Sequence, residues 1–230
     1  MSTKTIALIF IWMLVQLEPP AYAQNAFQIG ALPSINLNSK LKHGWSLNTR
    51  VESRQLFQQR EPDEAVARKY EYVLTDFSFI AAKKVGLNSR IAGGYLIRFE
   101  ADEIFHRFIQ QYVVVQKLSG FRLAHRFLSD QTYSQRENPE FRIRYRVTSE
   151  IPLNGESVDP GEFYLKINHE YINSLQAKEY DLEMRLVPLL GYDLSNRYKL
   201  EAGLDYRVSS FLRNETSHRY WVALNFFVEI

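Results

Sequence analysis

Hydrophobic and polar residues alternate with a period of two along most of the chain. The clearest example is 218–230, where Tyr220, Val222, Leu224, Phe226, Val228 and Ile230 fall on one face. Successive side chains of a β-strand point to opposite faces, so this period predicts strands. Eleven segments show it, at residues 27–37, 45–57, 70–82, 89–100, 104–117, 121–133, 141–151, 162–173, 179–193, 198–211 and 218–230.

The predicted strands are long and their connections are unequal. They run for about 11 to 15 residues, whereas a soluble strand has about 5 or 6 and a tilted membrane strand about 9 to 11. Short turns alternate with longer polar loops at 58–69 and 134–140, so the short connections fall at one end of the barrel and the long ones at the other. The connection 152–161 is the exception, because it is long but falls at the end with the short turns. Outer-membrane barrels show such an asymmetry. We therefore predict an all-β fold, an antiparallel transmembrane β-barrel of about 10 to 12 strands.

The first segment conflicts with this prediction. Single-chain bacterial barrels have an even number of strands, and Pro33 interrupts 27–37 with a residue that cannot donate a ladder hydrogen bond. We expect the segment to lie in or against a barrel of about 10 strands, or to be half of a split that makes about 12.

The beginning of the chain has the form of an export signal. Lys4 precedes an apolar run from Thr5 to Leu17, and Ala21-Tyr22-Ala23 supplies a small-x-small cleavage site. The run of about 13 residues is shorter than the roughly 20 that a membrane-spanning helix needs. We predict a signal peptide at 1–23, an outer-membrane β-barrel at 24–230 and localisation in a Gram-negative outer membrane. The alternative is an uncleaved anchor.

Aromatic residues near the strand ends favour lipid outside the barrel. Trp45, Tyr70, Tyr133 and Tyr198 are examples, and amphipathic rings prefer the headgroup level of a bilayer. The terminal strand resembles the signal that the barrel-assembly machinery reads, although it ends in Ile230 rather than Phe. We expect outer-membrane lipid and this machinery as partners. A soluble secreted lipocalin-like binding protein is the alternative, and it requires the apolar face to point inward.

Several segments of the C-terminal half resemble one family. They are Arg142 to Arg146, Ile151 to Gly155, His169 to Asn173, Tyr180 to Arg185, Gly191-Tyr192 and Leu200 to Gly203. Through them, residues 120–210 resemble the domain-of-unknown-function 2490 family, whose members are predicted outer-membrane barrels. Met184-Arg185 stands where the family pattern has Asn-Arg. The resemblance implies a fold and a location, and it supplies no catalytic or binding residues.

Charge limits the functions that the chain can perform. The sequence has 28 Lys+Arg against 26 Asp+Glu, without the basic stripe that binds nucleic acid. Polar residues on the inward faces should pair across a narrow lumen, because an unpaired buried charge is costly. Alternatively they bind a polar ligand or line a narrow pore. The inward candidates are Arg126, Asp130, Arg144, Arg146, Glu170, Asp181, Glu183 and Arg185.

The sequence contains no catalytic constellation. His125 and Ser129 share a strand face but lie roughly 13 Å apart along an extended chain, so they cannot pair. Cysteine is absent and no histidine has a partner at metal-ligand spacing. We predict no cofactor, no metal and a non-enzymatic protein with a structural, ligand-binding or narrow transport role. An outer-membrane enzyme that modifies lipid or lipopolysaccharide is the alternative.

Overall fold

The protein is a closed β-barrel of eleven strands. The structure, a computed structural model, describes residues 26–61, 64–210, 212 and 216–230, and the predicted signal peptide at 1–23 lies outside them. Within the described ranges, no helix is long and apolar enough to cross a membrane. The strands are β1 (Ala26–Lys40), β2 (Trp45–Arg60), β3 (Ala67–Lys84), β4 (Ser89–Glu100), β5 (Glu103–Leu118), β6 (Phe121–Tyr133), β7 (Glu140–Pro152), β8 (Phe163–Gln176), β9 (Glu179–Ser195), β10 (Tyr198–Ser209) and β11 (Ser217–Glu229).

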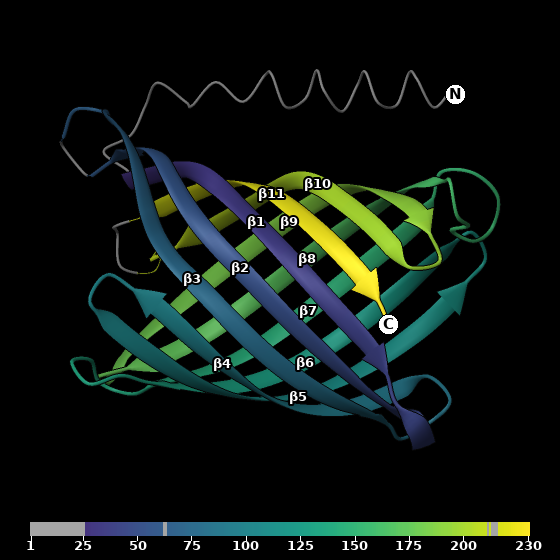
Figure 1. The fold of residues 1–230 in the computed structure, drawn as a ribbon. Helices are drawn as coiled ribbons and strands as arrows, with labels where there is room; N and C mark the ends of the chain where they lie inside the picture. Colours follow the sequence, from purple (N-terminus) through teal and green to yellow (C-terminus); the bar gives the residue numbers. More distant parts are fainter. Residues whose placement is uncertain (1–25, 62–63, 211, 213–215) are drawn as a thin grey trace.

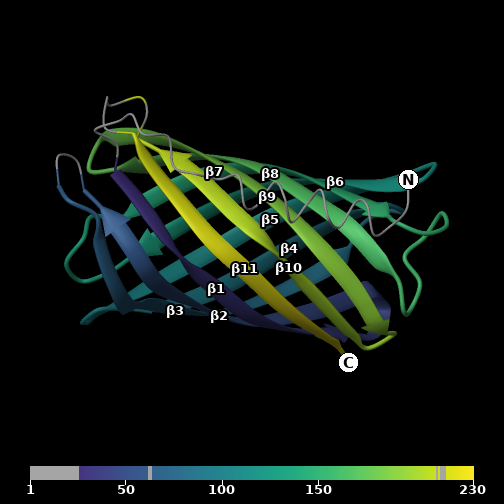
Figure 2. The ribbon, with the colours of Figure 1, turned by 90° about the horizontal axis from the view of Figure 1, so that it is seen from above.

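The barrel closes between its first and last strands. β1 pairs antiparallel with β2 and parallel with β11, beside which it lies in Figures 1 and 2. The predicted barrel of about 10 to 12 strands is confirmed, but the expectation of an even number was wrong. The first segment neither lies in or against a barrel of about 10 strands nor is half of a split that makes about 12, because it is itself a strand of the wall. In an odd barrel of alternating strands the first and last run in the same direction, so closure requires a parallel pair.

Pro33 is compatible with this place in the wall. The ladder between β1 and β2 omits Leu32 and Pro33, whereas the ladder with β11 continues through both. The missing N–H therefore interrupts pairing on one side only. The C-terminus is fixed to β1, because the Ile230 N–H donates to the Asn38 carbonyl at 2.8 Å.

The two mouths of the barrel differ less than the sequence predicts. The mouth where β1 begins, here the N-terminal mouth, has loops 61–66, 134–139 and 210–216, but also the tight turns 101–102 and 177–178. The opposite C-terminal mouth holds Ile230 and the turns 41–44, 85–88, 119–120 and 196–197. The exception expected near 152–161 is present there as loop 153–162.

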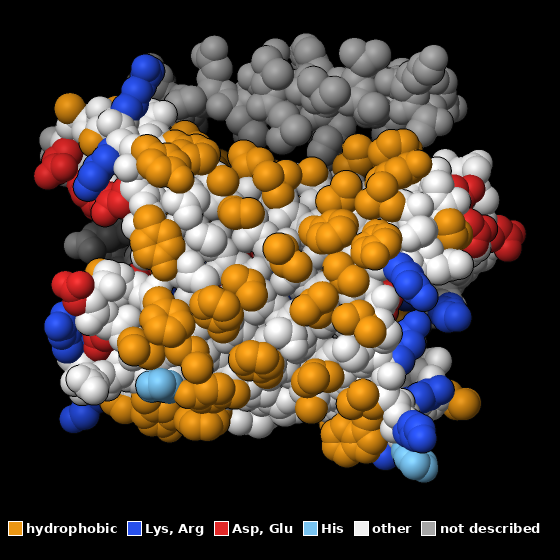
Figure 3. All heavy atoms as spheres, viewed as in Figure 1, with side chains coloured by type: hydrophobic (Ala, Val, Ile, Leu, Met, Phe, Trp, Pro, Cys, Tyr) orange, Lys and Arg blue, Asp and Glu red, His pale blue; other side chains and the backbone are white. Residues whose placement is uncertain are grey.

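Apolar side chains face outward and charged side chains face inward. Phe79, Ile143 and Leu224 are exposed on the outer surface, whereas Asp130 and Glu170 are buried inside. Figure 3 shows hydrophobic side chains over the middle of one outer face and charged side chains toward both ends. This is the reverse of the orientation that a lipocalin-like barrel requires.

Two apolar groups help to fill the interior. Leu32 and Leu56 pack with Trp221 where β1 meets β11 and β2. Gly30 makes room for this indole, because a Cβ there would lie 2.5 Å from the Trp221 ring. A second cluster joins Leu96, Ile109 and Leu128 on β4, β5 and β6.

Candidate functional site

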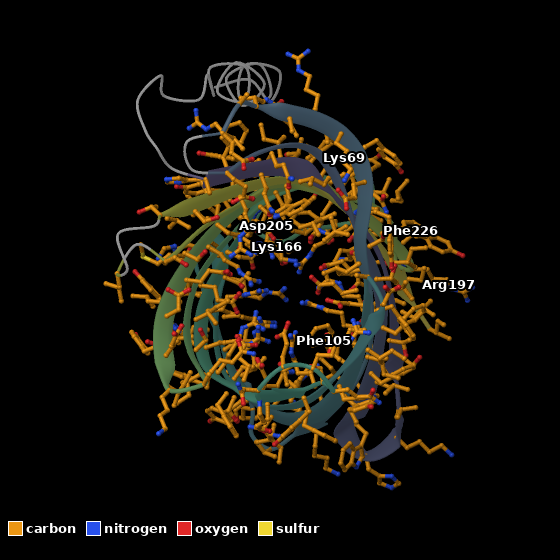
Figure 4. The ribbon with its side chains drawn as sticks, turned by 90° about the vertical axis from the view of Figure 1, so that its left-hand side faces the viewer. Lys69, Phe105, Lys166, Arg197, Asp205 and Phe226 are labelled. Atoms are coloured by element: carbon orange, nitrogen blue, oxygen red, sulfur yellow. The ribbon has the colours of Figure 1, made fainter. Side chains whose placement is uncertain are left out.

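The barrel encloses a cavity of about 790 Å³ lined mostly by polar and charged side chains. It extends from Ser134 and Glu137 at the N-terminal mouth to Lys166 and Phe227 deeper in the barrel. Figure 4 looks into this mouth, with Lys166 and Asp205 toward the lumen and Phe226 outside the wall. A cavity of this volume accommodates a small molecule.

One cross-strand row carries five arginines across six strands. Directly opposed residues in an antiparallel ladder point to the same face, so all the side chains of such a row reach the lumen. Only one carboxylate interrupts this row. In the order β6 to β11 its members are Arg126, Arg146, Glu170, Arg185, Arg207 and Arg219.

Glu170 lies at the centre of four guanidinium groups. Its side chain is only 1% exposed, and it accepts hydrogen bonds from Arg126 at 3.0 Å, from Arg144 at 3.0 Å and from Arg146 at 2.8 Å. Arg185 approaches with its Nη1 3.9 Å from Oε2. Because the four arginines come from β6, β7 and β9, this carboxylate ties three strands to β8.

Asp130 forms a second centre beside the first. Its side chain has no exposure, and its Oδ1 accepts from Arg142 Nε at 2.7 Å. Arg107 Nε is 3.5 Å from the same oxygen, and Arg144 Nη1 is 3.6 Å from Oδ2. Arg144 therefore connects the Asp130 and Glu170 centres.

These contacts extend into one network with an excess of positive charge. Arg142 also pairs with Glu140, and Glu183 pairs with both Arg185 and Arg219. Among the described residues this network, here the arginine network, has seven guanidinium groups and four carboxylates, a surplus of three positive charges. Its members are Arg107, Arg126, Arg142, Arg144, Arg146, Arg185, Arg219, Asp130, Glu140, Glu170 and Glu183.

The other ion pairs around the cavity are balanced. Lys166 pairs with Glu201 at 2.8 Å, and Arg207 pairs with Asp205 at 2.8 Å. The two remaining groups among the described residues together join three arginines to three carboxylates, so within the described ion pairs the surplus belongs to the arginine network. Those groups are Arg50 and Arg54 with Glu52, and Arg98 with Asp76 and Glu100.

The structure brings seven of the eight inward candidates into the arginine network. The exception is Asp181, which lines the cavity and accepts the Ser210 backbone N–H at 3.1 Å. The candidate set lacked four members of the network, which are Arg107, Glu140, Arg142 and Arg219. Arg219 has the same parity as Trp221 and could have been assigned to the inner face, whereas β5 has polar residues on both faces and obscures Arg107.

Histidine and tyrosine pair on the outer face. His125 Nδ1 is 2.8 Å from the Tyr145 hydroxyl, and His218 Nδ1 is 2.9 Å from the Tyr206 hydroxyl. Ser129 instead donates to Gln110 Oε1 at 2.9 Å. No group of three metal-binding side chains occurs in the part of the chain that the structure describes.

Comparison with known proteins gives a family. A family model described as "Protein of unknown function (DUF2490)" matches residues 29–222, which run from β1 into β11. Comparison with curated proteins and with solved structures found no match.

Proposed function

Because the chain belongs to the DUF2490 family, whose description gives no activity, we propose from the barrel itself that it is an outer-membrane protein. In this proposal the barrel spans the bilayer, and its lumen admits small hydrophilic solutes. The observation that carries the proposal is the apolar outer wall around a charged interior. Only closed barrels and helices satisfy every backbone hydrogen bond in hydrocarbon.

The outer surface supports a lipid environment. Phe79, Phe108, Phe127, Ile143 and Leu224 are exposed on different strands around the wall. In water, exposed apolar area costs roughly 25 cal/mol per Å², and contiguous apolar patches of this kind mark interaction sites. Lipid tails would cover this surface without a protein partner.

Aromatic side chains near the mouths support the same proposal. Phe57 and Tyr70 stack at the N-terminal mouth with ring centroids 6.0 Å apart. Tyr198 and Phe226 stack near the C-terminal mouth with centroids 6.0 Å apart. Rings at the two ends of the wall would lie at the two headgroup layers.

We further propose that the predicted signal peptide directs export, that the barrel-assembly machinery inserts the barrel, and that the protein is not an enzyme. The carboxylates Asp130 and Glu170 are engaged by arginines rather than placed beside a nucleophile. Such an arrangement suits binding and passage of a solute better than general acid or base chemistry.

Fractionation and cysteine labelling test the proposal. We expect the protein in the outer-membrane fraction, with heat-modifiable migration on gels. The chain has no native cysteine, so Leu224→Cys and Asn225→Cys provide adjacent probes of the outer and inner faces. In membranes, a lipid-soluble reagent should label the first and a water-soluble reagent the second. Recovery as a soluble periplasmic protein, or water-soluble labelling of both positions, would overturn the proposal.

A further inference from the structure

The arginine network has more hydrogen-bond donors than its carboxylates can accept. A guanidinium has five N–H groups and a carboxylate about four lone-pair sites, so seven arginines offer about 35 donors to about 16 sites. The Nε atoms of Arg126, Arg144, Arg146 and Arg219 are buried without a hydrogen-bond partner. The carboxylates hold the guanidinium groups in place and leave part of their donor capacity free.

The arginine side chains of this network line the cavity. Arg126, Arg144, Arg146 and Arg185 line it, whereas Glu170, which is 1% exposed, lies behind them. Arg126 and Arg146 each keep 26% of their side chains exposed. A solute that enters the lumen therefore meets guanidinium groups before it meets the carboxylate.

Like charges in this row repel one another. Arg126 lies directly opposite Arg146, Arg185 opposite Arg207, and Arg207 opposite Arg219. Directly opposed like charges destabilise a sheet. If pairing were their only role, one arginine for each carboxylate would suffice, but Glu170 alone has four.

The apolar side of the cavity strengthens any ionic contact there. Ile109 of the second apolar cluster lies opposite Asp130 in the ladder, and Leu128 lies opposite Arg144. Charge-assisted hydrogen bonds are stronger where water is partly excluded, and guanidinium groups bind oxyanions in a two-pronged geometry.

We propose that the arginine network is a binding site for a phosphate group, carried either by inorganic phosphate or by a small phosphate monoester. This inference rests on the proposed function, because the lumen must admit the solute. Two charges on a phosphate would offset most of the surplus of three. The cavity of about 790 Å³ leaves room for an organic substituent.

The test uses the full-length mature barrel folded in a non-ionic detergent. Inorganic phosphate, glycerol 3-phosphate and chloride are titrated at constant ionic strength by calorimetry. We expect both phosphates to bind and chloride not to bind. If glycerol 3-phosphate binds more tightly than inorganic phosphate, the ligand is a phosphate monoester. If it binds equally or more weakly, the ligand is inorganic phosphate. No phosphate binding by the folded barrel would overturn the proposal.

A matched pair of variants localises the site. Arg146→Gln should weaken phosphate binding about tenfold or more, since a charge-assisted contact is lost. Arg50→Gln removes the same charge from the same cavity but leaves Glu52 paired with Arg54. It should change affinity less than about twofold. Equal losses of phosphate affinity in both variants would indicate only a general electrostatic attraction between the lumen and anions, and they would overturn the assignment of the site to the arginine network.

Glu170→Gln separates an anion site from a purely structural cluster. The substitution removes a negative charge and so increases the positive surplus of the network. Phosphate should therefore bind the variant more tightly than the unsubstituted barrel, and adding phosphate should raise the unfolding temperature of the variant by more. A smaller effect of phosphate on this variant would count against the site. If the variant does not fold, the Arg146 and Arg50 pair still decides. The binding measurements use the barrel in detergent and do not depend on its location in the cell. If the protein is not in the outer membrane, fractionation will show this, whereas phosphate binding would still be observed.

Discussion

Arg146 on β7 and Glu170 on β8 lie directly opposite each other, and Arg146 Nη2 donates to Glu170 Oε2 at 2.8 Å. This pair belongs to the row from β6 to β11 in which all the residues except Glu170 are arginines. Because Glu170 is shared among four guanidinium groups, loss of the carboxylate exposes several charges to one another at once.

Removing the central carboxylate should destabilise the barrel strongly. In phosphate-free buffer, Glu170→Gln should lower the free energy of unfolding by about 3 kcal/mol, since buried arginines lose their shared partner. Urea unfolding of the refolded barrel measures this. Glu150→Gln is the control, because its partner Arg122 is half exposed, and it should cost less than about 1 kcal/mol. Similar losses in both variants would contradict the central role of Glu170.

Gly30 should not tolerate a side chain. A Cβ there would lie 2.2 Å from the Gln55 carbonyl oxygen and 2.5 Å from the Trp221 ring, so Gly30→Ala should cost about 1 to 3 kcal/mol. Gly93→Ala in β4 is the control, because its nearest neighbour would be 4.0 Å away. Unfolding curves for the two variants should differ clearly. If they coincide, β1 does not pack on Trp221 as described.

The parallel closure predicts a specific crosslink. Ser34 Oγ donates to Asn225 Oδ1 at 2.7 Å across the β1–β11 pair. Ser34→Cys with Asn225→Cys should therefore form a disulfide on mild oxidation, visible as altered migration on a non-reducing gel. Ser34→Cys with Glu229→Cys, four residues further along β11, should not. A crosslink only in the second pair would mean a different register.

Charge on the outer wall should be costly only where lipid surrounds it. Leu186 is exposed outside and the adjacent Val187 lines the cavity. In a bilayer, Leu186→Arg should destabilise the barrel by up to about 2 to 4 kcal/mol, depending on depth. Val187→Arg would place its charge in the polar cavity that Asp205 also lines, and it should be tolerated better. Folding titrations in lipid vesicles compare the two, and the reverse order would argue against a lipid-facing outer wall.

The outward histidines should have no chemical role. His125→Ala removes the contact with Tyr145 and leaves the interior unchanged. We expect unchanged lipid A profiles and a loss of stability of about 1 kcal/mol or less. The same result is expected for His169→Ala and His218→Ala. Altered lipid A in any of these variants would favour the lipid-modifying enzyme instead.

Much of the fold follows from local alternation. Each segment with a period of two became a strand, and several run a few residues further, as β3 does to Ala67 and Lys84. The even strand number failed because it is a regularity of known barrels rather than a property of these residues. Pro33 was misleading for a related reason, since its missing donor affects only the ladder toward β2.

The site was harder to predict than the fold. Alternation places Arg146 and Glu170 on the inner face, but it does not give the register between strands. Only the register brings Arg126, Arg146, Glu170 and Arg185 into one row. The surplus of positive charge in the arginine network also depends on the register. The numbers of basic and acidic residues are nearly equal over the whole chain, so the local excess of arginines appears only when the neighbours across the strands are known.

The seam between β1 and β11 also constrains the order of events during synthesis and folding. Ser34 and Asn225 are 191 positions apart, so the first strand to be made can complete its pairing only with the last. Closing so long a loop is entropically unfavourable and slows folding. Until β11 is available, β1 has an unpaired edge that can associate with other chains. A nascent chain would therefore need protection of this edge until β11 has been made.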